Sequence, residues 1–192
     1  MAYRQPDDYA GAGCLQRDQV AFASRHAAEG RLEGTSAGLM TQQMMIATVL
    51  PRTIAAVRQH LNMGDVPKAF KPALDKVWAY LRSHPGLRTD GHNILLYHHV
   101  ANPAEGMNVD FGVEVTRQFQ GGGEVACVET PGGEAAILIH RGPYSSLPLA
   151  HAALHQACAA SGRKIGSHSW EIYGDWTDDP TQLETEIVYL LA

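Results

Sequence analysis

The chain has 192 residues and a mass of 20.8 kDa, a length that fits one moderate domain or two small ones. Hydrophobic residues make up 45% and charged residues 18%, which excludes a wholly disordered chain. The net charge of −5 and the isoelectric point near 6.0 do not favour nucleic acid, so we expect no direct nucleic-acid binding by this chain. No run of about 18 apolar residues occurs, so we expect no membrane partner either.

The first 43 residues show no sustained helical or strand period. They predict a disordered or weakly ordered extension, with one short helix around 18–29, ahead of a domain at 44–192. A true start at Met40 or Met44 is the alternative. The N-terminus lacks a secretory signal, and the three cysteines are odd in number and widely spaced, which predicts reduced thiols and a cytoplasmic location.

The first half of the domain, residues 44–117, predicts the order strand, helix, strand, strand. The strand pattern starts after a turn at Leu50–Pro51, and Asp65 is placed to be the N-cap of the helix. The predicted elements are a strand at 53–61, a helix whose apolar stripe runs from Phe70 to Leu81, and strands at 93–100 and 109–115.

The second half, residues 122–192, predicts the same order after one extra strand. Its elements are strands at 123–130 and 135–140, a helix with Ser146 as N-cap and Gly162 as C′ glycine, and strands at 169–176 and 184–191. This internal repeat predicts a duplicated β-α-β-β α+β fold with pseudo-twofold symmetry. We expect an antiparallel sheet with helices on one side and a central ligand groove at the seam. No phosphate-binding glycine motif is present, which excludes a Rossmann-like architecture.

Glu171 is the first candidate for function because it interrupts a strand of bulky residues, Trp170–Tyr173. Alternation places Glu171 and Tyr173 on one face of this strand. In the repeat, Glu171 corresponds to Leu95 and Tyr173 to Tyr97. A partly desolvated carboxylate among aromatic rings suits a lipophilic cation. An exposed glutamate, or one paired with an arginine, is the alternative.

The loop from His140 to Tyr144 is the second candidate. Gly142–Pro143 fixes a tight turn, and Tyr144 is placed to project into whatever the turn borders. An ordinary strand-to-helix connection with a packed tyrosine is the alternative.

Histidines raise the question of a metal site. His151 and His155 share a helix face, but Ala152 stands where a zinc protease would carry its glutamate. His98 and His99 are adjacent in a strand and point to opposite faces. No third ligand has a recognisable spacing, so we expect neither a metal nor another cofactor.

These residues together resemble a known family. The segments HRGPY, WEIY and TEIVYLL, in this order, are similar to the GyrI-like small-molecule-binding domain, also called the bacterial transcription activator effector-binding domain, which is fused to AraC-type and MerR-type regulators. The resemblance implies a pseudo-twofold α+β domain in which Glu171 faces the ligand, beside Tyr173 and Tyr144. Tyr97 is added from the internal repeat. His140 and Trp170 belong to the same motifs and complete the predicted set, although alternation puts Trp170 on the opposite face.

Three functions fit this pattern. The first is a stand-alone binding protein for small lipophilic, cationic or aromatic molecules, which would serve as a sensor or sequestering protein in transcription regulation or drug response. The second is a hydrolase that adds water to electrophilic compounds, with Glu171 as base and Tyr144 or Tyr173 as proton donor. The third is a protein-interaction module that uses acids of the C-terminal part, such as Asp178 and Asp179.

Overall fold

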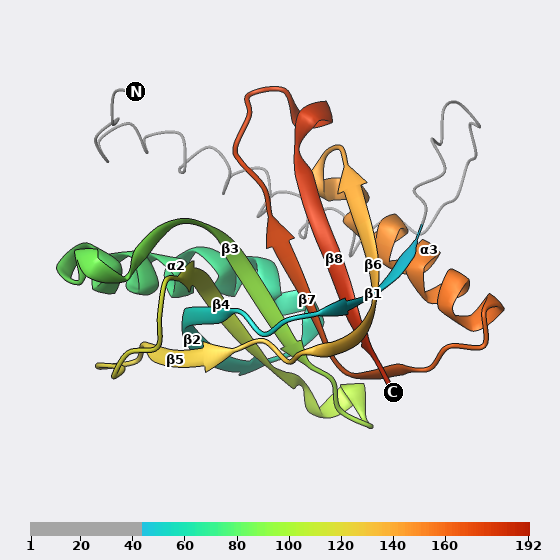
Figure 1. The fold of residues 1–192 in the computed structure, drawn as a ribbon, viewed down its shortest axis with the longest axis horizontal. Helices are drawn as coiled ribbons and strands as arrows, with labels where there is room; N and C mark the ends of the chain where they lie inside the picture. The colour runs from blue at the N-terminus through green and yellow to red at the C-terminus, as the bar shows by residue number, and fades with distance from the viewer. Residues whose placement is uncertain (1–43) are drawn as a thin grey trace. The chain divides into compact units, whose positions relative to one another are not determined.

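An antiparallel sheet and two helices make up residues 44–192, which the computed structural model describes apart from the side chains of residues 88–90 (Figure 1). The extension, its helix and the start at Met40 predicted over residues 1–43 lie outside this range. In chain order the elements are β1 (Met45–Val49), β2 (Thr53–Leu61), α2 (Val66–Ser83), β3 (Arg88–His98), β4 (Met107–Val115), β5 (Ala126–Glu129), β6 (Gly133–Arg141), α3 (Leu147–Ala160), β7 (Ile165–Tyr173) and β8 (Glu184–Leu191).

The strand order is β1-β6-β8-β7-β3-β4-β2-β5, and every pair is antiparallel. The predicted α+β class and antiparallel sheet are therefore confirmed. The strands of each half have the same relative order, β2-β4-β3 in the first and β6-β8-β7 in the second, and the halves meet at the β3–β7 pair. This order agrees with the predicted repeat, while the duplication itself stays a prediction.

Both helices cover the same face of the sheet, as predicted. The buried stripe of α2, which includes Phe70, Leu74 and Leu81, joins one apolar cluster with Leu147 and Leu154 of α3. Helix α2 contacts β2 and β4, and α3 contacts β6. Each large apolar side chain buried in this way stabilises the fold by about 1.5–3 kcal/mol. No helix among residues 44–192 combines the length and the apolar character needed to cross a membrane.

Both helices begin after the predicted N-cap residues, but the capping hydrogen bonds expected of those side chains are not formed. Asp65 and Ser146 are the N-cap residues, yet neither side chain caps its helix. The Ser146 hydroxyl instead donates to the carbonyl oxygen of Pro143 at 2.7 Å. Gly162 follows the end of α3 with φ +68°, a left-handed conformation that glycine adopts without steric cost.

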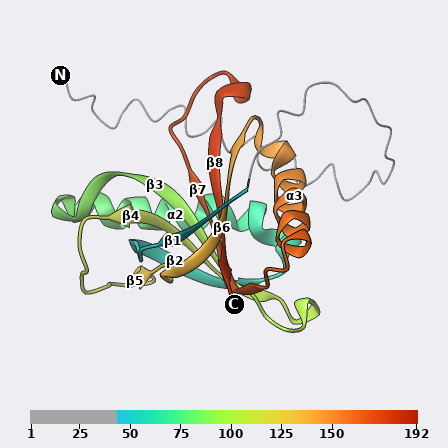
Figure 2. The same cartoon turned by 45° about the vertical axis from the view of Figure 1, so that its right-hand side comes forward.

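The two ends of the sheet meet each other. Strand β1 pairs with β6 and strand β2 pairs with β5 in one continuous register: Val49 lies opposite Gly133, and Thr53 opposite Glu129. Residues 45–56 therefore run beside residues 126–137, as the cyan and yellow segments show in both views (Figures 1 and 2). Because β2 also pairs with β4 and β6 also pairs with β8, the sheet closes on itself.

Closure explains how the face without helices is buried. A second apolar cluster fills this inner face, and its members are Ile54, Ala56, Ile94, Leu96, Ala135, Ile137, Trp170, Ile172 and Val188. The interior is full where Gly112 lies, because an added Cβ there would come within 2.9 Å of Ile54 Cδ1. The inner face of the closed sheet is therefore buried by side chains of the sheet itself, without a helix.

Most strand boundaries differ from the predicted ones, and the larger departures are at β1, β3 and β7. Strand β1 was not predicted at all, and β3 begins at Arg88 rather than at residue 93. Strand β7 ends at Tyr173, so Trp176 of the predicted strand 169–176 lies outside it, 39% exposed. Strands β2 and β8 have the predicted bounds.

Candidate functional site

Glu171 lies at the centre of the helix-covered face. It belongs to β7, between Leu95 of β3 and Ile187 of β8, its direct neighbours across the sheet. Both neighbours are apolar and almost fully buried, and Glu171 itself is only 6% exposed. A carboxylate in this position needs hydrogen-bond partners, because a buried charge without them is costly.

Both oxygens of the Glu171 carboxylate have partners. The hydroxyl of Tyr173 donates to Oε2 in a short hydrogen bond, and Nε2 of His151, on α3, lies 2.9 Å from Oε1. The hydroxyl of Tyr97 also contacts this carboxylate. Among the described residues, His151 is the one basic side chain that contacts the Glu171 carboxylate.

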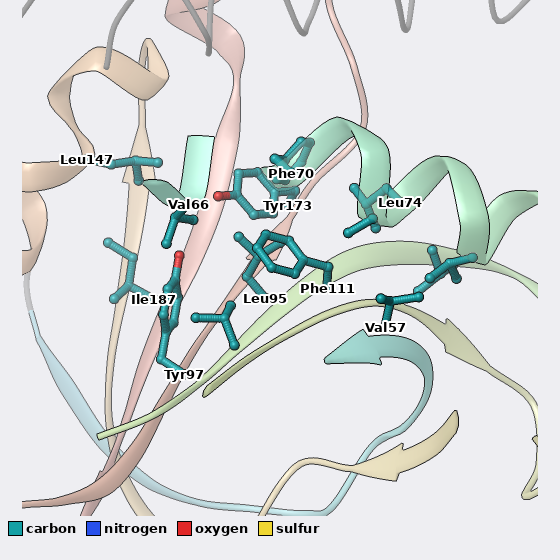
Figure 3. Packing of buried hydrophobic residues seen from close by; sticks show 14 of the residues in the cluster. Val57, Val66, Phe70, Leu74, Leu95, Tyr97, Phe111, Leu147, Tyr173 and Ile187 are labelled. Atoms are coloured by element: carbon teal, nitrogen blue, oxygen red, sulfur yellow. The ribbon is translucent and has the colours of Figure 1, made fainter. Parts of the chain in front are cut away.

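Aromatic residues from several elements gather beside the carboxylate. The ring of Tyr173 contacts Phe70 of α2 with centroids 5.8 Å apart and Tyr144 with centroids 5.4 Å apart, both edge to face. Figure 3 shows Phe70 against Tyr173, and it shows the hydroxyls of Tyr97 and Tyr173 pointing into the same region. Tyr97 and Tyr173 thus lie against the Glu171 carboxylate, and Phe70 and Tyr144 pack on the ring of Tyr173. We call these four aromatic residues the tyrosine cage.

Tyr189 of β8 links the cage to more histidines. Its hydroxyl lies 2.9 Å from Nδ1 of His151, and its ring stacks on His99 and meets the edge of His155. His151 and His155 therefore share one face of α3, as predicted. His99 is held by Ser169, whose hydroxyl is 2.8 Å from Nε2.

The tyrosine hydroxyls stay protonated at neutral pH. Burial, and next the charge of Glu171, raise the pKa of Tyr97 and Tyr173 well above the ordinary value. Burial also raises the pKa of Tyr144 and of Tyr189 to about 12, with the Glu171 charge contributing at Tyr189. These hydroxyls can therefore donate hydrogen bonds to Glu171 or to a ligand.

The structure brings most of the predicted site residues together. Three of the predicted residues, Tyr97, Tyr144 and Tyr173, belong to the tyrosine cage. The fourth, Glu171, is the acid beside it. His140 is buried on the same face, its Nε2 is 3.0 Å from the Ser146 hydroxyl, and its pKa is lowered by burial and by the charge of His151.

Trp170 does not join them. Its side chain lies in the inner apolar cluster, on the other face of the sheet, and is 2% exposed. Strand alternation causes this separation from Glu171, so we leave Trp170 out of the candidate site.

Three residues of the site were not predicted: Phe70, His151 and Tyr189. Phe70 was assigned to the helix core, and His151 was weighed only as a metal ligand. Their contacts depend on where each helix rests on the sheet. Tyr189 could have been found from alternation in β8, since it shares a face with Ile187, the direct neighbour of Glu171.

The residues that were considered for metal binding and for protein interaction lie mostly outside this site. Within residues 44–192 no three His, Cys, Asp or Glu side chains are placed to hold a metal ion. His98 points to the other face from His99, as predicted, and its Nε2 contacts Asp110 at 2.6 Å. Asp178 and Asp179 are exposed, and Asp179 accepts hydrogen bonds from the backbone and hydroxyl of Thr181. A protein-interaction role for these acids stays a prediction, as does the ligand groove.

The fold defines an α+β domain with a buried acid among tyrosines. Residues 42–191 match the model of the GyrI-like small molecule binding domain, and the chain therefore belongs to the GyrI-like family. A comparison with curated proteins finds no match.

Solved structures share the fold at low sequence identity. The C-terminal domain of EcmrR is 22% identical, with a TM-score of 0.65 over 80% of this chain and 99% of that domain. SAV2435 bound to tetraphenylphosphonium is 8% identical, with a TM-score of 0.58 over 78% of this chain and 94% of that one. A hydrolase encoded by lin2189 from Listeria innocua is 12% identical, with a TM-score of 0.55 over 79% and 92%.

Proposed function

We propose that the protein binds small lipophilic cations, or cationic aromatic molecules, at Glu171 and acts as a sensor or sequestering protein in transcription regulation or drug response. One observation carries the proposal: a carboxylate that is almost fully buried lies against Tyr97 and Tyr173 of the tyrosine cage, and no Lys or Arg pairs with it among the described residues.

Both the carboxylate and the aromatic rings would stabilise a bound cation at this position. The carboxylate supplies the opposite charge in a desolvated site, where the attraction is stronger than in water. Each ring face adds cation–π attraction of about 0.5–2 kcal/mol. The apolar side chains of Leu95 and Ile187 on either side of Glu171 favour a ligand that carries its charge on a lipophilic body.

The comparisons support a ligand of this kind. SAV2435, which shares the fold, is described in complex with tetraphenylphosphonium, a lipophilic cation, and EcmrR carries the same fold as its C-terminal domain. Tetraphenylphosphonium is therefore the first probe. Tetraphenylborate is its matched control, because the two ions have nearly the same shape and opposite charge.

The test is the affinity of both ions for the wild type and for Glu171→Gln. We expect the wild type to bind the phosphonium at least about tenfold more tightly than the borate, and Glu171→Gln to remove this preference. Glu134→Gln is the control, since it removes an exposed carboxylate and changes the net charge equally. Equal loss of both ions in Glu171→Gln, or an unchanged preference, would overturn selection by charge.

A hydrolase is the second candidate, favoured by the hydrogen bond from the Tyr173 hydroxyl to Glu171. In this function Glu171 would deprotonate a water that adds to an electrophilic carbon, while Tyr144 or Tyr173 would protonate the leaving group. Turnover of epoxides or other strained electrophiles by the wild type, abolished in Glu171→Ala, would establish it. Binding of such compounds without turnover would argue for the binding protein instead.

A further inference from the structure

Two buried polar atoms beside the tyrosine cage have no hydrogen-bond partner among the described residues. They are Oδ1 of Asn93, on β3, and Oγ1 of Thr185, on β8. We propose that these two residues form a polar subsite next to Glu171, which binds a hydroxyl or N–H group carried by the cationic ligand. This inference rests on the proposed function and adds to it the chemical class of the ligand, a lipophilic cation that also carries a hydrogen-bond donor.

Asn93 and Thr185 flank Tyr173 on either side in the sheet. Thr185 is the direct neighbour of Tyr173 in the β7–β8 pair. On the other side Leu95 pairs with Glu171, and two positions further along this antiparallel pair Asn93 comes opposite Tyr173. Residues directly opposite each other in a sheet point to the same face. Asn93 and Thr185 therefore point to the helix-covered face, which also carries Glu171.

The subsite and the acid lie in adjacent rows of this face. Tyr173 follows Glu171 by two residues in β7, which separates their rows by about 7 Å along the strand. The hydroxyl of Tyr173 donates back to the Glu171 carboxylate, so its side chain reaches from one row to the other. A ligand whose charge contacts Glu171 can therefore contact Asn93 or Thr185 with a group about 7 Å from that charge.

The chemistry of the two oxygens favours a donor. The amide oxygen of Asn93 only accepts hydrogen bonds, while the hydroxyl of Thr185 can accept or donate. Thr185 is fully buried, and a buried oxygen without a partner is costly. A ligand hydroxyl or N–H group can donate to either oxygen and removes this cost. An apolar group in the same place would leave both oxygens unpaired.

The direct neighbours of Thr185 form their hydrogen bonds elsewhere. His140 lies opposite it in β6, and Nε2 of this histidine is 3.0 Å from the Ser146 hydroxyl. Tyr173 lies opposite it in β7 and donates to Glu171. The partner of Thr185 therefore does not come from residues 44–192. We assign it to the ligand, and a bound water is the alternative that the experiment tests.

Two derivatives of tetraphenylphosphonium are the probes, and they differ at the para position of one ring. One carries a hydroxymethyl group, whose oxygen lies at a comparable distance from the charge. The other carries an ethyl group, which has nearly the same size and no donor. We expect the wild type to bind the hydroxymethyl cation at least about fivefold more tightly in calorimetric titrations, although the ethyl cation is the more apolar.

Thr185→Val and Asn93→Leu each remove one oxygen and nearly keep the size of the side chain. The preference for the hydroxymethyl cation should fall below about twofold in one variant or both, and the variant that loses it identifies the partner. Binding of tetraphenylphosphonium itself should change less than about twofold, because Glu171 is intact. Thr130→Val is the matched control, since it removes an equally buried hydroxyl that bonds to Arg52 outside the subsite, and it should keep the preference.

The outcomes separate this subsite from the proposed function. No preference in the wild type, or an unchanged preference in both Thr185→Val and Asn93→Leu, would overturn the subsite, assign the two oxygens to bound water and leave charge selection at Glu171 in place. No binding of tetraphenylphosphonium by the wild type would overturn both proposals.

Discussion

Leu95 lies directly opposite Glu171 across the β3–β7 pair, at the seam between the two halves of the sheet. The two residues also correspond to each other in the predicted repeat. One half thus carries an apolar side chain where the other carries the acid, so a single negative charge stands at the centre of this face.

A second acid at this seam should destabilise the fold. In Leu95→Glu two carboxylates would face each other in a buried pair, and we expect the free energy of unfolding at neutral pH to fall by about 3–5 kcal/mol. Part of the loss should return near pH 5, where the pair can share a proton. Urea denaturation measures both values, and Leu95→Gln, of the same size without the charge, should show no such recovery in acid.

The pair of Arg58 and Asp110 should respond asymmetrically to substitution. The guanidinium binds both carboxylate oxygens at 2.7 Å, but Asp110 is fully buried while the Arg58 side chain is 50% exposed. Arg58→Met removes both hydrogen bonds of the guanidinium to a buried charge, which keeps His98 as a partner, and should cost about 3 kcal/mol. Asp110→Asn leaves a cation that water can solvate, so we expect a smaller loss of about 1–2 kcal/mol in denaturant titrations. The reverse order would contradict this account.

Thr185 should tolerate loss of its hydroxyl. It is fully buried, and its Oγ1 has no hydrogen-bond partner among the described residues. Because a buried polar atom without a partner is costly, Thr185→Val should raise the free energy of unfolding by about 1 kcal/mol. Thr130 is the control, since its equally buried Oγ1 accepts from the backbone N–H of Arg52 at 2.9 Å. Thr130→Val should lower stability by about the same amount, and a loss in both variants would refute the prediction.

Acid should weaken the fold through the histidines with lowered pKa. Burial is the main cause at His168, followed by the charge of His98. Such a group binds its proton more readily in the unfolded chain, so stability is complete above the ordinary value of about 6.5 and falls as pH drops from there through the lowered pKa. We expect the melting temperature to fall between about pH 7.5 and pH 5.5, and to fall less in His168→Gln. A melting temperature that rises in acid would contradict the sign.

The sequence predicted the elements whose own pattern is strong. Alternation gave β2 and β8 their bounds, and the apolar stripe of α2 and the proline and glycine after it gave the helix its extent. Strand β1 was missed because its five residues are mostly exposed and owe their conformation to pairing with β6, almost 90 positions along the chain. Closure of the sheet follows from that pairing and left no local signal.

The candidate site was predicted where its residues share a strand or a motif. Glu171 and Tyr173 followed from alternation, and Tyr144 followed from its Gly-Pro turn. The contact of His151 with Glu171 could not be predicted from the sequence, because it depends on how α3 is rotated against β7 and β8. Trp170 was included through its motif, although alternation already pointed to the opposite face.

The meeting of the two sheet ends also limits contact with other chains. Strands β1 and β5 are the outermost strands, and they offer an intruding strand only five and four residues of unpaired backbone. Edges this short are poor templates for aggregation. The protection depends on β1, however, because its detachment would uncover the backbone of β6 along Gly133–Ile137.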